Sequence, residues 1–276
     1  MSWKPIVVGV DGSPEAASAA VFAAGLAQRA ATACRLVHAS RDALGSVPEP
    51  GGEQRAQVVA ALGTRVPAEV LETLMIRRGR PAAVLNGAVA TLGAELVVLG
   101  GKHHPALARW LGGSTSVNVA RTMLVPLLVT VGAPAIRRVL VAVDVSAAAG
   151  PTLTAAERYA ALFGAELRAL SVVEPLPVVV EVPQPDTTDY YRLWEETIAR
   201  DVWPLIRAPG VRTVVRQGTA ALDAILREAA EWRSDLLVVG SHGKGSVTRM
   251  LVGSVTEGLI NHLPTSLLVV PAAAAA

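Results

Sequence analysis

The glycine-rich stretch at residues 240–255 has the residue types and the spacing of a phosphate-binding loop. Gly240 is followed after two residues by Gly243, and after nine more by Gly253 and Ser254. Glycines let a backbone pass close to a ligand and reach positive φ. A helix that starts at Gly253 offers free N–H groups and a dipole that favour an anion, and the Ser254 hydroxyl adds a donor. This stretch is therefore the candidate site for phosphates.

The charged residues of this loop favour holding phosphates over hydrolysing them. Lys244 and Arg249 are basic, and residues 241–252 contain no Asp or Glu. Glu257 lies one turn into the next helix, so no base that could activate water is evident, and no catalytic residue is assigned. The stretch is not a Walker loop, since Gly245 follows the lysine, and it lacks the six-residue glycine spacing of a dinucleotide fingerprint.

Histidines and serines in the chain suggest two other interpretations, for which the patterns are weaker. His103 and His104 are adjacent, so they point apart in an extended chain, and no Cys or carboxylate stands nearby at ligand spacing. His242 with Ser246 or Ser254 lacks the G-x-S-x-G context of a hydrolase nucleophile. We therefore expect neither a protein-bound metal nor hydrolase chemistry.

The elements that must position the loop alternate between apolar strands and helices. The strand runs are almost continuously apolar, which is typical of strands buried on both faces of a sheet. Helices of about 10–15 residues between them imply right-handed crossovers and a parallel sheet. Ser13–Pro14 and Gly79–Arg80–Pro81 are predicted helix starts. The predicted strands cover about residues 5–10, 34–39, 70–76, 95–99, 125–131, 137–143, 166–172, 211–216, 235–239 and 265–270.

Four residues with binding potential stand at the carboxyl ends of predicted strands. Asp11 and Asp144 follow the first strand of each half of the chain, and Gly100 and Gly240 follow the fourth. Ligands of open parallel sheets bind beyond these ends, where the strand order reverses. The two Asp residues could also cap the helices that follow them, a role that does not exclude a ligand.

The chain contains an internal repeat. IVVGVDGS at 6–13 resembles VLVAVDVS at 139–146, an offset of 133 residues, and AELVVLG at 94–100 resembles SDLLVVG at 234–240, an offset of 140. The change of offset predicts an insertion of about seven residues between the second and third strands of the second copy. The predicted domains are residues 1–132 and 137–276.

Together these features resemble the universal stress protein family. Its ATP-binding members carry G-x2-G-x9-G-(S/T) after the fourth strand, which residues 240–254 match in full, and VGVDGS at 8–13 and LLVV at 267–270 resemble its first and last strands. The resemblance covers both copies. It implies a Rossmann-like α/β fold with two tandem open, parallel, five-stranded sheets flanked by helices. It also implies an ATP-binding protein, with magnesium as a possible companion ion, that senses or regulates the response to stress.

The resemblance also implies roles for residues of the second copy. Asp144 would reach the ribose or adenine end of ATP, and backbone near Val172 and Val173 would border the adenine. The turn after the first strand, Asp-Val-Ser at 144–146, departs from the usual Asp-Gly-Ser but keeps Asp and Ser. The implied ATP-binding residues of this copy are Asp144, Val172, Val173, Gly240, Gly243, Lys244, Arg249, Gly253, Ser254 and Val255.

The first copy departs further from the motif. Asp11, Gly100, Gly113 and Ser114 are in place, but His103 stands where the second glycine is expected. A histidine side chain could crowd the phosphates or oppose positive φ. The four matching residues are candidates for ATP binding, and the sequence leaves open whether this copy binds it.

The insertion in the second copy is proline-rich over 175–185 and then aromatic, with Tyr190 and Tyr191. Four residues beyond it share one helix face, so core packing is the main interpretation, and a mobile flap or partner surface is the alternative. That face comprises Trp194, Ile198, Val202 and Leu205.

Composition limits the classes of partner. The net charge is +2, with 25 basic and 23 acidic side chains, which is too balanced for a nucleic-acid-binding surface. No apolar stretch reaches the roughly 18–20 residues of a membrane span, and no signal segment precedes the first strand. Cys34 is the only cysteine, so it forms no intrachain disulfide. We expect a cytoplasmic protein that binds neither nucleic acid nor membrane.

Two alternatives to a nucleotide sensor remain. One is a weak ATPase, and the other is an interaction module that does not bind nucleotides. The fifth strands, Leu127–Val131 and Leu267–Val270, are short and apolar, which suits edge pairing. In the family such strands pair domains, so the resemblance implies an intramolecular pseudo-dimer and a homodimer through strand five. A regulatory protein partner is expected, but the sequence does not identify it.

Overall fold

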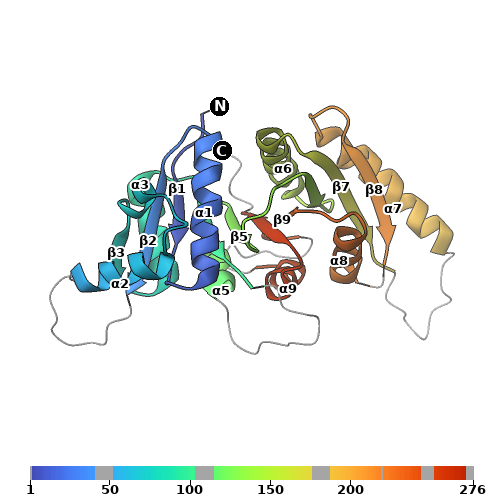
Figure 1. The fold of residues 1–276 in the computed structure, drawn as a ribbon. Helices are drawn as coiled ribbons and strands as arrows, with labels where there is room; N and C mark the ends of the chain where they lie inside the picture. Colours follow the sequence, from blue (N-terminus) through green and yellow to red (C-terminus); the bar gives the residue numbers. More distant parts are fainter. Residues whose placement is uncertain are drawn as a thin grey trace. The chain divides into compact units, whose positions relative to one another are not determined.

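The computed structural model describes residues 2–40, 52–102, 115–175, 187–218, 220–243 and 252–271. The chain divides into two compact units, Met1–Ala135 with Ile260–Val269 and Ile136–Leu259 with Val270–Ala276. Each unit packs helices on a sheet that is mostly parallel (Figure 1), as the sequence predicts.

The first unit is built on five parallel strands in the order β3-β2-β1-β4-β5. Helix α1 contacts α2, and α4 contacts α5. Right-handed crossovers place the two pairs on opposite faces, because the chain turns back past β1 to reach β4. The elements are β1 (Ile6–Gly9), α1 (Pro14–Arg29), β2 (Cys34–Ser40), α2 (Gly52–Leu62), α3 (Ala68–Leu71), β3 (Met75–Arg78), α4 (Pro81–Leu92), β4 (Leu96–Gly100), α5 (Thr115–Thr122) and β5 (Leu127–Thr130).

The first unit also includes the last strand of the chain, β10 (Ser266–Val270). It pairs antiparallel with β5, with Leu267 opposite Val129. Since β5 also pairs with β4, both edges of β5 are occupied. The pairing of the two fifth strands is thus observed within the chain. A homodimer stays a prediction, and it would need an edge other than those of β5.

The second unit repeats this plan with four parallel strands in the order β9-β6-β7-β8. The strand order reverses between β6 and β9, so the crevice that can take a ligand lies at their carboxyl ends. The elements are β6 (Arg138–Ala142), α6 (Ala149–Phe163), β7 (Glu166–Val173), α7 (Thr187–Asp201), a 3₁₀ turn (Trp203–Leu205), β8 (Arg212–Gln217), α8 (Ala221–Glu231), β9 (Leu236–Gly240) and α9 (Ser254–His262).

The core of both units is aliphatic. Val7 and Val97 of the first unit, and Leu140 and Val238 of the second, are completely buried in central strands. Helix α1 packs on its sheet mainly through alanines, whose small side chains let the helix approach closely. The high aliphatic and low aromatic content of the sequence is what such a parallel core requires.

Both predicted helix starts are confirmed. The Ser13 hydroxyl accepts the N–H of Ala16 at 3.2 Å, and Pro14 occupies the first turn of α1. Pro81 likewise begins α4. Its fixed φ suits the first helical turn, where a backbone N–H would have no acceptor within the helix.

The predicted third strand at 70–76 is wrong in position. Its first half is the short helix α3, which follows Pro67, and the strand begins only at Met75. The Thr73 hydroxyl donates to the carbonyl of Val70 at 2.6 Å and so helps to close that turn. A short apolar run fits a buried helical turn as well as a strand, so the sequence pattern could not separate them.

The structure of the second copy shows part of the predicted insertion as helix. Helix α7 has 15 residues, whereas α2 at the corresponding place has 11. Residues 176–186, which hold most of the proline-rich stretch, lie outside the described residues. The longer helix is used by the site described below.

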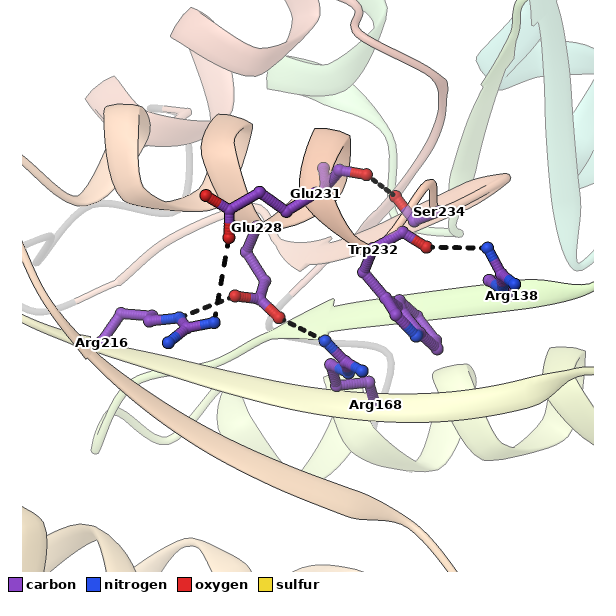
Figure 2. Close-up of polar contacts among 8 residues, drawn as sticks. Arg138, Arg168, Arg216, Glu228, Glu231, Trp232 and Ser234 are labelled. Atoms are coloured by element: carbon purple, nitrogen blue, oxygen red, sulfur yellow. Dashed lines mark hydrogen bonds and ion pairs between the residues drawn. The ribbon is translucent and has the colours of Figure 1, made fainter.

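A buried carboxylate fixes α8 to β7 and β8 in the second unit (Figure 2). The Glu228 side chain, 1% exposed, accepts hydrogen bonds from Arg168 at 2.6 Å and from Arg216 at 2.7 Å. The guanidinium of Arg168 lies 4.4 Å from the ring centroid of Trp232. Because each partner comes from a different element, the cluster sets where α8 lies on the sheet.

Among the described residues, no helix has the length and the apolar character needed to cross a bilayer.

Candidate functional site

A cavity of about 680 Å³ opens in the second unit at the carboxyl ends of its strands. It lies where the strand order reverses, at β6 and β9, and its walls also include β7, α7, α8 and the first turn of α9. A cavity of this size is in the range of small-molecule sites. The fold therefore places a binding cavity where the sequence locates its candidate residues.

One end of the cavity is made of backbone. Gly240, Gly243, Gly253, Ser254 and Val255 all line it, as expected from the sequence. Helix α9 begins at Ser254, and helix geometry leaves the N–H groups of its first turn without acceptors inside the helix. These N–H groups and the helix dipole favour a negatively charged ligand group.

The backbone on both sides of the loop is tied in place. The N–H of Gly253 donates to the carbonyl of Ser241 at 2.8 Å, and the Thr256 hydroxyl donates to the carbonyl of Gly240 at 2.8 Å. The end of β9 and the start of α9 are thus held together at the cavity. Lys244 and Arg249 lie outside the described residues.

The glycines of the loop provide room rather than an unusual backbone conformation. Gly240, Gly243 and Gly253 have no positive φ, so that part of the sequence interpretation is wrong. A Cβ at Gly240 would lie 3.1 Å from the Cβ of Ala148, so this glycine lets α6 pack against β9. A Cβ at Gly243 would lie 2.8 Å from Oδ2 of Asp144.

Asp144 stands at the end of β6, half-buried, and lines the cavity. Its Oδ1 accepts the N–H of Ser146 at 3.0 Å, and Asp11 accepts the N–H of Ser13 at the same distance in the first unit. Each carboxylate therefore shapes the turn before a helix. The prediction that the two Asp residues cap these helices is wrong, because the N-cap residues are Ser13 and Ala148. Oδ2 of Asp144 faces Gly243, at the loop side of the cavity.

The other end of the cavity is apolar. Val172 and Val173 at the end of β7 line it, together with Ala221 and Ile225 of α8. The lining residues that sequence reasoning missed include three from α7, namely Tyr190, Trp194 and Ile198. The four-residue spacing of this helix face was visible in the sequence, but it indicates a core as readily as a binding surface.

The predicted face of α7 is only partly correct. Ile198 and Val202 are buried at 2% and 1% exposure, while Leu205 is 42% exposed because the chain has passed into a 3₁₀ turn. Trp194 is half-buried and faces the cavity. This face therefore serves both the core and the cavity.

Two buried polar atoms near the cavity lack hydrogen-bond partners among the described residues, Nε2 of His242 and Oγ of Ser146. Nδ1 of His242 pairs with the Ser241 hydroxyl at 2.8 Å. Buried polar groups are normally satisfied by protein, water or a ligand. In the described part of the chain no three His, Cys, Asp or Glu side chains are grouped as metal ligands.

The corresponding place in the first unit holds different side chains. Glu15 takes the place of Ala148 and pairs with Lys102 at 3.5 Å, where the second unit has His242. A Cβ at Gly100 would lie 2.3 Å from the carbonyl carbon of Glu15, so this glycine is required by the packing of α1. His103, Gly113 and Ser114 lie outside the described residues.

The apolar end also differs in the first unit. Aligning the buried pair Val58 and Leu62 of α2 with Ile198 and Val202 of α7 puts Gln54 at the place of Trp194. The Gln54 side-chain amide donates to the hydroxyl of Ser40, at the end of β2, at 2.9 Å. A polar contact within the protein thus stands where the second unit has an aromatic wall.

Each half of the chain matches the same family model. The model is described as the universal stress protein family, and it matches residues 2–130 and 135–271. The chain belongs to this family. Its two copies are tandem universal stress protein domains, and the matched ranges run close to the repeat boundaries seen in the sequence.

Several relatives of this universal stress protein share its tandem length. A universal stress protein of Mycobacterium tuberculosis strain H37Rv is 29% identical over 280 residues, which is 93% of each chain. The crystal structure of a universal stress protein from Archaeoglobus fulgidus matches with a TM-score of 0.68 at 20% identity, over 97% of this chain and 98% of that one. A putative universal stress protein from Pseudomonas aeruginosa matches with a TM-score of 0.66 at 17% identity, over 98% and 94%. These two structures support the fold.

Proposed function

We propose that this universal stress protein binds ATP in the cavity of its second unit and acts as a nucleotide-dependent sensor or regulator of the stress response. The observation that carries the proposal is the two-ended cavity. Backbone N–H groups of α9 and the Gly240 loop stand at one end, and apolar side chains of β7, α7 and α8 stand at the other. A nucleotide has the same two-ended chemistry, anionic at the phosphates and flat and apolar at the base.

The charges of the site suit retention of the triphosphate. The loop sequence contributes Lys244 and Arg249, and the carboxylate of Asp144 stands where ribose hydroxyls could donate to it. Its Oδ1 is already engaged with the Ser146 N–H, which makes it a positioned acceptor rather than a base for water. A magnesium ion that accompanies ATP would be held by the phosphate oxygens, as is usual for this ion.

We assign one nucleotide to each chain, in the second unit. In the first unit the Glu15 carboxylate stands at the phosphate end and neutralises Lys102, and one of its oxygens, Oε2, is buried without a hydrogen-bond partner among the described residues. A carboxylate in that position repels phosphates. The candidate residues Asp11 and Gly100 are explained by the turn and the packing of α1.

Calorimetry with a matched pair of glycine variants tests the proposal. Among the described residues a Cβ at Gly253 would meet nothing closer than 3.6 Å, so we expect Gly253→Glu to fold and its carboxylate to repel the phosphates. Gly52 is exposed at the start of α2, and no described residue lies within 4 Å of its Cβ position, so Gly52→Glu makes the same charge change away from the cavity.

Wild type and Gly52→Glu are expected to bind one ATP per chain, and Gly253→Glu to bind about 100-fold more weakly or not at all. Freshly purified protein that releases ATP on heating would give independent support. A wild type that shows no heat of binding with ATP and releases no nucleotide would overturn the proposal. Two ATP sites per chain would overturn the assignment to the second unit alone.

Phosphate release separates a sensor from a weak ATPase. We expect turnover that does not rise above that of buffer. Turnover above background that disappears in Gly253→Glu would establish the ATPase instead.

A further inference from the structure

Helix α7 supplies an aromatic wall to the apolar end of the cavity. Tyr190 and Trp194, one helical turn apart, both line the cavity, and their rings meet edge to face with centroids 6.4 Å apart. Tyr190 also makes an edge contact with Tyr191 at 5.5 Å. Facing them at this end are Val172 and Val173 of β7. The wall therefore borders the space next to the strand end, away from the Gly240 loop.

The wall is held by Glu174, the first residue after β7. The Tyr190 hydroxyl donates to the carbonyl of Glu174 at 3.1 Å. The carboxylate of Glu174 accepts the N–H of Ala221, the first residue of α8, at 2.7 Å. A single residue thus ties both α7 and α8 to the end of β7. Helix α8 is also fixed to β7 and β8 through Glu228.

We propose that Tyr190 and Trp194 bind the base of the nucleotide and give the second unit its selectivity for a purine nucleotide over free polyphosphate. This inference rests on the proposed function. Aromatic side chains gain affinity by stacking on the flat face of a base, and the edge-to-face contact of this pair leaves aromatic surface at the cavity. In the first unit Gln54 stands at the place of Trp194 and bonds Ser40, so the wall belongs to the second unit.

The test compares two ligands on four proteins. The ligands are ATP and inorganic tripolyphosphate, which carries the phosphates without the base. The proteins are wild type, Trp194→Leu, Tyr190→Leu and the control Leu193→Ala. Leu193 lies between the two aromatic residues on α7 but is 61% exposed and does not line the cavity. Leucine keeps the wall apolar and removes the ring; at position 190 it also removes the hydroxyl that donates to the Glu174 carbonyl, so Trp194→Leu is the cleaner of the two variants.

Loss of one ring is expected to weaken ATP binding about tenfold and to leave tripolyphosphate binding unchanged. Leu193→Ala is expected to bind both ligands as wild type does. Equal ATP affinity in wild type and both leucine variants would overturn the inference while leaving the ATP site intact. Parallel loss of both ligands would also overturn it, because the ring would then act on the whole cavity. Failure of wild type to bind ATP would overturn the proposed function itself.

A fluorescence measurement tests the same inference without the leucine variants, which could be destabilised. Trp194→Phe keeps an aromatic ring in the wall and removes one of the five tryptophans of the chain. ATP is expected to change the tryptophan emission of wild type, and Trp194→Phe is expected to bind ATP within about threefold of wild type without that change. An emission change that persists in Trp194→Phe would show that the base contacts another part of the protein.

Discussion

Oδ2 of Asp144 lies 2.8 Å from the point that a Cβ of residue 243 would occupy. The carboxylate at the end of β6 and the loop that follows β9 therefore share one small space. Glycine at 243 is what allows both to stand there. The relationship links the ribose end and the phosphate end of the candidate ATP site.

Gly243→Ala is expected to displace the Asp144 carboxylate and to weaken ATP binding about tenfold, the cost of one hydrogen bond to a charged group. The displaced group is the end of a side chain, so the melting temperature should change little. Calorimetry and thermal unfolding check the two expectations. Gly25→Ala is the control, since nothing lies within 4 Å of its Cβ position in the exposed part of α1. Unchanged ATP affinity in Gly243→Ala would argue against a role for Asp144.

Glycine 100 is expected to be essential for stability. A Cβ there would meet the backbone of Glu15 at 2.3 Å, and the backbone of a packed helix cannot rotate away as a side chain can. Gly100→Ala should therefore lower the free energy of unfolding by about 1–3 kcal/mol or more. Gly87→Ala is the matched control, because position 87 is an open, exposed site inside α4. It should raise stability by about 0.5–1 kcal/mol. Urea unfolding of both variants measures the change in the free energy of unfolding. No change in Gly100→Ala would contradict the packing described for α1.

The Glu228 cluster should contribute to stability at neutral pH. Glu228→Gln leaves Arg168 partly buried, at 16% exposure, without its charged partner, so we expect a loss of about 3 kcal/mol. Glu231→Gln on the same helix is the control, since that side chain is 59% exposed and lies 4.0 Å from Arg216. It should change stability by less than about 0.5 kcal/mol. Similar effects of the two substitutions would contradict the structural role of Glu228.

The same cluster predicts a pH dependence. Burial alone would raise the pKa of Glu228, but hydrogen bonds from Arg168 and Arg216 outweigh it and hold the pKa below its ordinary 4.5. A carboxyl whose pKa is lower in the folded state stabilises fully above pH 4.5 and loses that effect as the pH falls through the folded-state value. Denaturant titrations below pH 4.5 should show a steeper loss of stability for wild type than for Glu228→Gln. The same pH dependence of stability in wild type and Glu228→Gln would contradict this role of Glu228.

The thiol of Cys34 is expected to be unreactive in the folded protein. Burial raises its pKa to about 12, with only a small opposing effect of Arg35, so almost no thiolate exists at pH 8. A thiol reagent should label it at the rate at which the chain unfolds, and at once in denaturant. Fast labelling of the native protein would contradict the burial of β2.

The sequence predicted the fold because the features that carry it are local. The near-continuous apolar runs predict buried strands, and the short patterns at Ser13–Pro14 and Pro81 predict helix starts. The internal repeat shows the same order of elements a second time. The strand at 70–76 was misplaced because an apolar run of that length does not distinguish a helical turn from a strand.

The site was predictable only in part, for a different reason. Gly240 and Gly253 belong to a motif of fixed spacing, Asp144 directly follows a predicted strand, and the structure places all three at one cavity. Tyr190 and Trp194 line the same cavity from α7. Their position there depends on tertiary packing, which a local sequence pattern does not predict. Positive φ at the loop glycines was a wrong inference, because glycine serves packing as often as unusual backbone geometry.

The outermost strands in each unit, β3 and β8, carry arginines. Arg77 and Arg78 end β3, and Arg212 stands in β8, all of them exposed. An outermost strand of a sheet is a template for adding strands of other molecules, and fixed like charges along it oppose that addition. We therefore expect the protein to remain unaggregated at high concentration, because its outermost strands resist the addition of further strands.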